Sequence, residues 1–261
     1  MPQIYDVRPD GVYVPVRRYQ HARKIKMEVV LAGVLHTGEK KFYQHVDRIL
    51  QGCDVVIYEQ PFPRDQETMQ QLDDDWRKLL YDEDLDEAFL ASIYLPMPPQ
   101  KFIRNHGLKD ESHCFDYSQS HWLSGDGAWG QEAKDAALPD EVWQRIRKAI
   151  RTLDTTVKQE KVAAAKKFLQ GVDVETASMR AYVDFRNLHE EEIERSVNKH
   201  TVVDPRDEMT LGVFDKIVSG RKPVSVGILF GNGHVPGMDT LLHDRGYVLR
   251  EVTWLRVLTL T

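Results

Sequence analysis

The strongest constraint on how this chain can fold is a pair of apolar runs, each of which ends in Gly-x-x-His. The first run covers Met27–Val34 and leads into His36, and the second covers Val224–Phe230 and leads into His234. Runs that are apolar at nearly every position are typical of strands buried on both faces of a parallel sheet. We therefore expect both runs to form core strands of such a sheet.

A helix and a further strand are predicted after each motif. The first motif is followed by helical spacing over Glu39–Gln51 and a strand over Val55–Tyr58, and the second by a helix over Met238–Arg245 and a strand over Tyr247–Trp254. The short helical connection in the first unit predicts that its two strands run parallel. The shared plan indicates an internal repeat, and packed repeats place matching strand ends side by side. Ligands of open parallel sheets bind at those strand ends.

The region between the two units is highly charged and mostly helical in pattern, with helices expected over Glu141–Gly171 and Asp173–Lys199. We predict that the whole chain is one α/β domain. Two repeated strand–GxxH–helix–strand units form a central, mostly parallel sheet from residues 1–60 and 200–261. Residues 61–199 form a large helical insertion, and its charged helices leave two alternatives open, a lid or a homodimer surface.

Composition and charge argue against several classes of protein. The net charge is −6 and no long basic stripe offsets it, which argues against a nucleic-acid partner. The longest apolar run, Ala88–Leu95, is far shorter than the roughly 20 residues that span a bilayer. Met1–Lys26 lacks the continuous apolar core of a signal peptide, and Cys53 and Cys114 lack a metal-type spacing. These features predict a cytoplasmic protein with no membrane span and two free thiols.

Three side chains that can do chemistry fall at predicted strand C-termini: His36, Glu59 and His234. Two histidines and one carboxylate suffice as protein ligands for a catalytic divalent metal with one open position for water. Such a metal would lower the pKa of the water and polarise a carbonyl group. Plainer interpretations exist, because single Gly-x-x-His patterns are common and Glu59 could be a surface charge. Matching places in a repeat favour a shared site, although Thr253 stands where a second glutamate would be.

Three stretches of the chain resemble the TraB/PrgY/GumN proteins: Val29–Gly38, Val55–Glu59 and Gly227–Gly237. These proteins belong to a wider superfamily with the Tiki proteases, the erythromycin esterases and the ChaN-like haem-binding lipoproteins. Their shared pattern is two Gly-x-x-His motifs with a glutamate and an arginine. The resemblance covers residues 27–60 and 200–256 and leaves the helical middle unaligned.

The resemblance implies a site and several functions. His36 and His234 match the motif histidines, Glu59 the glutamate and Arg206 the arginine. A Tiki-like peptidase or amidase would bind manganese, cobalt or zinc through the two histidines and the glutamate, and would act on a peptide or small molecule. An enzyme of the erythromycin esterase type would need no metal, because a histidine would act directly as base while Glu59 orients the water. A haem-like ligand-binding protein and a partner protein with a relict site are the non-enzymatic alternatives.

Arg206 is implied to hold a substrate carboxylate or an oxyanion through bidentate hydrogen bonds. Pro205 precedes it where the family usually has glutamate. The alternative is an ion pair at the start of a helix, with Asp207 or Glu208.

Three further residues are candidates for substrate contact. Asp116 ends a short strand predicted over His113–Tyr117, and His121 follows in a loop. Asn232 lies between the two glycines of the second motif.

Overall fold

The computed structural model describes residues 4–59, 100–125, 178–180, 183, 204–220 and 224–260. The chain divides into two compact units. The first unit comprises Met1–Gln60, Gly107–Gly127 and Val203–Leu260, and the second comprises Pro61–His106, Ala128–Val202 and Thr261. Residues 107–127, which the sequence assigned to the helical insertion, therefore pack in the first unit. The two long helices predicted for the insertion lie outside the described residues, apart from the short helical pieces at 179–180 and 183.

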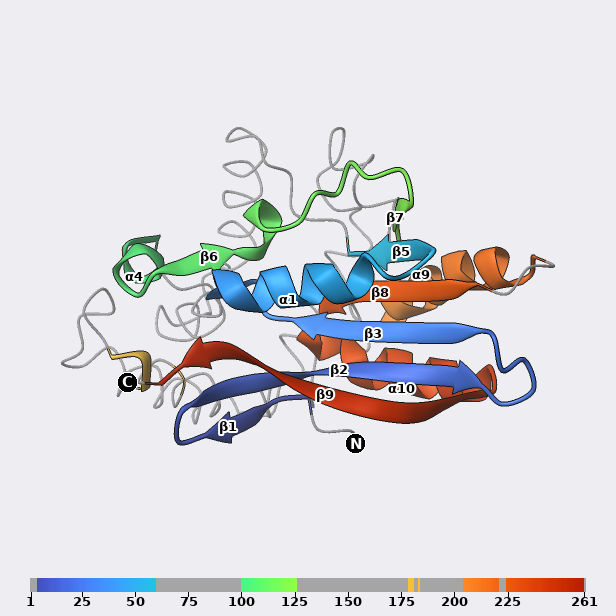
Figure 1. Cartoon of the computed structure of the whole chain (residues 1–261), viewed down its shortest axis with the longest axis horizontal. Helices are drawn as coiled ribbons and strands as arrows, with labels where there is room; N and C mark the ends of the chain where they lie inside the picture. Colours follow the sequence, from blue (N-terminus) through green and yellow to red (C-terminus); the bar gives the residue numbers. More distant parts are fainter. Residues whose placement is uncertain are drawn as a thin grey trace, which may run out of the picture. The chain divides into compact units, whose positions relative to one another are not determined.

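The main sheet belongs to the first unit, and it has a parallel centre with antiparallel strands on one side. Its strands, in their order across the sheet, are β1 (Asp6–Arg8), β2 (Gly11–His21), β3 (Glu28–Val34), β8 (Ser225–Gly231), β5 (Val55–Tyr58) and β7 (Trp122–Ser124), while β9 (Tyr247–Thr259) pairs with β2 (Figure 1). The pairs β3–β8, β8–β5 and β5–β7 are parallel, whereas β2 is antiparallel to β1, β3 and β9. The predicted α/β class and central, mostly parallel sheet are confirmed.

The parallel strands end at one edge of the sheet. Val34 of β3 pairs with Gly231 of β8, and Tyr58 of β5 pairs with Leu229, two residues earlier on β8. The N–H of Glu59 continues this pairing and donates to the Leu229 carbonyl at 2.8 Å. Residues that directly follow β3, β8 and β5 are therefore brought together at the carboxyl edge, where parallel sheets bind ligands.

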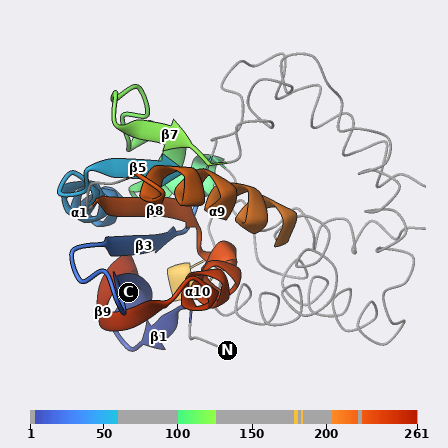
Figure 2. The same ribbon diagram turned by 90° about the vertical axis from the view of Figure 1, so that its right-hand side faces the viewer.

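Helices cover both faces of the sheet (Figure 2). Helix α1 (Lys40–Leu50) lies on one face and buries Phe42, Val46 and Leu50, which recur at helical spacing. Helices α9 (Asp204–Val218) and α10 (Val235–Asp244) lie on the other face. With both faces covered, β3 and β8 are buried along almost their whole length, as their apolar sequences predict. In the described part of the chain, no helix is both long and apolar enough to cross a membrane.

The two Gly-x-x-His motifs lead into different structures. After His36 the chain stays extended as β4 (Thr37–Glu39), which pairs with β6 (Leu108–Asp110) in a small antiparallel sheet before α1 begins. After Gly231 the chain turns at once into a 3-10 turn, Asn232–His234, that continues into α10. The second helix therefore begins three residues before the predicted start, because Pro236 fits its first turn.

Two strand predictions need correction. No strand forms over His113–Tyr117; a 3-10 turn occupies Glu111–His113, because the Asp110 carboxylate accepts the Ser112 N–H at 2.8 Å and caps the turn. The last strand, β9, runs five residues beyond its predicted end, because it pairs with β2 from Gly11 to His21.

Candidate active site

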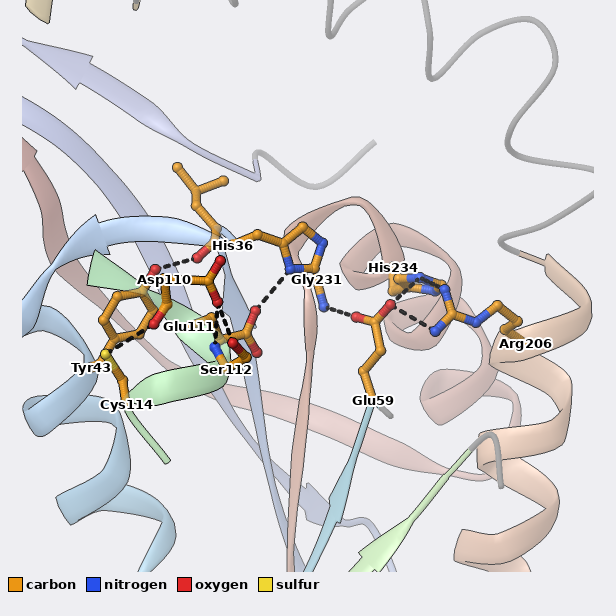
Figure 3. Close-up of polar contacts among 11 residues, drawn as sticks. His36, Tyr43, Glu59, Asp110, Glu111, Ser112, Cys114, Arg206, Gly231 and His234 are labelled. Atoms are coloured by element: carbon orange, nitrogen blue, oxygen red, sulfur yellow. Dashed lines mark hydrogen bonds and ion pairs between the residues drawn. The ribbon is translucent and has the colours of Figure 1, made fainter. Parts of the chain in front are cut away.

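Glu59 lies at the centre of the candidate site, immediately after β5 (Figure 3). Its Oε1 is 2.7 Å from Nη2 of Arg206, and its Oε2 accepts a hydrogen bond of 2.6 Å from the Gly231 N–H. Nε2 of His234 lies 3.7 Å from the same Oε1. The carboxylate is thus held on both oxygens, on one by a side chain of α9 and on the other by the backbone at the end of β8.

Glu111 contacts the imidazole ring of His36: Oε2 of Glu111 lies 2.9 Å from Nδ1 of His36 (Figure 3). Glu111 reaches His36 because β6, which directly precedes it, pairs with β4, which directly follows His36. The Glu111 N–H also donates to the His36 carbonyl at 2.9 Å. The His36 side chain is 51% exposed and that of Glu111 is 9% exposed. The pair therefore joins a half-exposed imidazole to a buried carboxylate.

His234 has a matching partner in buried surroundings. Its Nδ1 lies 2.7 Å from Oδ1 of Asp207, and the two side chains are 7% and 1% exposed. Nη1 of Arg206 lies 3.4 Å from Nε2. A guanidinium can only donate, so both contacts are satisfied when Nδ1 carries the proton for Asp207 and Nε2 accepts from Arg206. His234 therefore connects Asp207 to Arg206.

Two glycines allow these groups to approach each other. A Cβ at Gly231 would lie 3.1 Å from Oε2 of Glu59 and 3.6 Å from both Cε1 and Nε2 of His36. The edge of the imidazole and the carboxylate thus meet over this glycine. A Cβ at Gly237, in the first turn of α10, would overlap Oδ2 of Asp207. Only glycine at this position lets Asp207 reach its present place.

Burial and charge shift the two glutamates in opposite directions. Burial would raise the pKa of Glu59, but electrostatic interactions with Arg206 and the two histidines outweigh it, together with a backbone hydrogen bond from Gly231, and lower the pKa to about 2. Burial raises the pKa of Glu111 despite the hydrogen bond with His36. Glu59 is therefore a firmly ionised acceptor, whereas the ionised form of Glu111 is disfavoured by its burial.

The structure gathers four of the predicted site residues and leaves three outside. His36, Glu59, Arg206 and His234 form the network described above. Asp116 is exposed and accepts hydrogen bonds from Ser118 at 3.0 and 2.6 Å. His121 precedes β7, which runs parallel to β5, and therefore lies at the opposite edge of the sheet from Glu59. Asn232 is buried and donates to the Ile4 carbonyl at 2.6 Å, so it fixes the turn of the second motif.

Two residues of the network, Asp207 and Glu111, are not among the predicted site residues. The sequence offers Asp207 only as an ion-pair partner of Arg206, although its spacing is informative: Asp207, Leu211 and Phe214 share one apolar stripe of α9, and all are buried. A carboxylate on such a stripe needs a partner inside the protein. Glu111 has no comparable signal, because its contact depends on the pairing of β4 with β6.

The predicted metal ligands can be compared with the donors around them. One feature fits a metal site: each histidine Nδ1 is held by a carboxylate, as is common for metal-binding histidines. Other features do not, since both oxygens of Glu59 already face N–H donors and the cationic Arg206 contacts His234. Within the described ranges, no three His, Cys, Asp or Glu side chains are grouped to hold a metal ion. As placed, these residues do not fit a shared ion, and the metal stays a prediction.

Comparison with protein-family models found no match to this chain, and comparison with curated proteins found none. The TraB/PrgY/GumN resemblance therefore stays a prediction.

Proposed function

We propose that the compact unit formed by residues 1–60, 107–127 and 203–260 is a hydrolase. In this hydrolase His36 activates a water molecule for attack on an ester or amide carbonyl, without a metal ion. The observation that carries this proposal is the approach of His36 and Glu59 to each other above the Gly231 backbone. A water molecule above Gly231 would have the imidazole Nε2 as its base and the Glu59 carboxylate as a second acceptor.

The proton transfers follow from the charge on each group. Glu59 accepts one hydrogen of the water and fixes its orientation, while Nε2 of His36 takes the other proton as the oxygen attacks the carbonyl carbon. Nε2 then gives this proton to the leaving oxygen or nitrogen as the C–O or C–N bond breaks. The imidazole returns to its starting state, and the products are an acid and an alcohol or amine.

Arg206 is assigned to the oxyanion that forms during attack. Its guanidinium lies 2.7 Å from Glu59, it is 16% exposed at the side chain, and it carries five N–H donors in one plane. Donors that are already in place when negative charge develops lower the barrier most effectively. His234 supports this role by accepting from Nη1 of Arg206 at 3.4 Å. In this mechanism His234 holds the arginine and does not itself react.

The sharpest test changes the floor of the proposed water site. Gly231→Ala would place a methyl group 3.1 Å from Glu59 and 3.6 Å from the His36 ring, whereas Gly233→Ala, in the same motif, would meet nothing within 4 Å. Neither glycine has a positive φ, so both variants are expected to fold. Hydrolysis of p-nitrophenyl esters and of peptide p-nitroanilides is measured for the parent and both variants.

We expect Gly231→Ala to lose about 100-fold in rate, because the methyl group displaces the water and separates the two groups that hold it. Gly233→Ala should retain the parental rate. A parent that cleaves neither probe class, or two variants with equal rates, would contradict the proposal.

A further inference from the structure

We propose that Glu111 is a positioning residue that fixes the tautomer of His36, with the proton on Nδ1 and the reactive lone pair on Nε2. The inference rests on the proposed hydrolase function, because only there does the position of the lone pair matter. It extends that function to a residue that belongs to neither Gly-x-x-His motif.

Glu111 is joined to His36 at two points. The side chains meet at 2.9 Å between Oε2 and Nδ1, and the Glu111 N–H donates to the His36 carbonyl at 2.9 Å. The pairing of Thr37 with Asp110 places the two residues on adjacent ends of β4 and β6. The carboxylate therefore has a fixed position relative to the imidazole, set by backbone pairing.

The contact is selective because the Glu111 side chain is buried beside His36 and, when ionised, only accepts hydrogen bonds. Glu111 is buried, with 9% of its side chain exposed, and within the described ranges its side chain forms a hydrogen bond with His36. In its ionised form, which a higher pH favours and burial opposes, the carboxylate can only accept, so this form selects the imidazole tautomer that donates from Nδ1. A half-exposed histidine without this partner would sample both tautomers and other ring orientations in water.

The selected tautomer points the lone pair to the side of the ring where the reaction is proposed. Nε2 and Cε1 of His36 each lie 3.6 Å from the point where a Cβ of Gly231 would be, and Oε2 of Glu59 lies 3.1 Å from it. With the opposite tautomer, Nε2 would carry a hydrogen toward Glu59 and would have no lone pair with which to take a proton from water. Glu111 thereby acts on the reaction through His36, without touching the reacting atoms.

The test reads the tautomer directly and needs no substrate. In ¹⁵N-histidine-labelled protein at about pH 8, where most imidazoles are neutral, long-range ¹H–¹⁵N correlation distinguishes a protonated from an unprotonated ring nitrogen. We expect His36 of the parent to show a protonated Nδ1 and an unprotonated Nε2. A protonated Nε2 in the parent would overturn the proposal, whatever the activity.

Glu111→Gln supplies the second arm, because it keeps the shape of the side chain and gives it an N–H₂ group that donates. We expect this variant to show Nε2 protonation at His36 and to lose about 100-fold in kcat for p-nitrophenyl ester hydrolysis, with KM little changed. Glu28→Gln, an exposed glutamate at the opposite end of β3, is the control that should change neither. A Glu111→Gln protein with the parental tautomer and rate would overturn the proposal.

The two arms separate the failure of this inference from failure of the proposed function. If the parent hydrolyses no probe but the tautomer shifts on Glu111→Gln, the hydrolase proposal fails and the positioning contact stands. If the parent is active and Glu111→Gln changes neither the spectrum nor the rate, the positioning role of Glu111 fails and the hydrolase proposal stands. If Glu111→Gln does not fold, the spectrum of the parent alone still decides the tautomer.

Discussion

The two Gly-x-x-His motifs end in similar imidazole–carboxylate pairs, but the pairs lie in different surroundings. The His36 ring is 51% exposed beside a buried glutamate, whereas His234 and Asp207 are 7% and 1% exposed. Nε2 of the buried histidine also contacts Arg206 at 3.4 Å. In the proposed reaction, the first motif therefore supplies the base and the second supplies the support for the arginine.

The element that follows each motif accounts for this difference. After His36 the chain remains extended in β4, so the ring stays at the edge of the sheet. After His234 the chain enters α10, which packs against α9, and the ring is buried against Asp207 of α9 and Phe230 of β8. The same four-residue pattern can thus provide a reactive or a structural histidine, and the next few residues decide which.

The largest effect we expect separates the two histidines. His36→Ala should lower kcat/KM for p-nitrophenyl ester hydrolysis by about 1,000-fold, or about 4 kcal/mol in activation free energy, because the general base is lost. Its free energy of unfolding in urea should change less than that of His234→Ala, since the His36 ring is half-exposed and the raised pKa of Glu111 lets its carboxyl group take up a proton when the imidazole is removed. His234→Ala should instead lose about 3 kcal/mol of unfolding free energy, because the buried Asp207 loses its 2.7 Å contact with His234. Equal stability losses in both variants would remove the distinction.

Low pH should weaken the contribution of Glu59, the carboxylate at the centre of the candidate site, to the stability of the fold. The pKa of Glu59 is about 2 in the folded protein, below its ordinary value of 4.5. The ionised glutamate therefore stabilises the fold above about pH 4.5, and this contribution of about 3 kcal/mol is lost as the pH falls toward 2. Urea unfolding between pH 7 and pH 2 should show this loss in the parent and a smaller loss in Glu59→Gln. Parallel pH curves would contradict it.

Amide substitutions compare the two carboxylates that contact the histidines, Asp207 and Glu111. Asp207→Asn should lower the free energy of unfolding by about 2 kcal/mol, because a buried, charge-assisted hydrogen bond to His234 is weakened. Glu111→Gln should leave it within about 0.5 kcal/mol of the parent or raise it, since the raised pKa of Glu111 shows that its charge is disfavoured in the folded state. Thermal unfolding of both variants gives the order. A larger loss in Glu111→Gln would reverse our assignment.

The smallest effect that we expect concerns Gly237, which lies against Asp207 of the buried His234–Asp207 pair. Gly237→Ala should destabilise the protein by about 1 kcal/mol, because its methyl group displaces Asp207. Gly212→Ala, within α9, meets nothing within 4 Å and should stabilise the helix by about 0.5–1 kcal/mol. Opposite shifts in melting temperature are the expected result, and a shared direction would show that Asp207 is not tightly placed.

Much of the sheet and part of the site could be predicted from the sequence. The apolar runs identified β3, β5 and β8, and the parallel order of these strands then brings His36 and Glu59 to one edge. The carboxylate partners of the histidines could not be predicted from the sequence. The contact of Asp207 with His234 depends on how α9 packs, and the contact of Glu111 with His36 depends on a three-residue pairing between distant segments. Periodicity reports which face of an element is buried, but it does not report which elements meet.

Metal dependence tests the central claim most directly. The protein is purified without chelator, and its metal content and rate of p-nitrophenyl ester hydrolysis are measured before and after dialysis against EDTA, beside the double variant His36→Ala/His234→Ala. We predict an unchanged rate in metal-free parent protein and a rate lost in the double variant. A stoichiometric metal in the parent that is absent from the double variant, with activity that vanishes on dialysis and returns with manganese, cobalt or zinc, would contradict a base-catalysed mechanism.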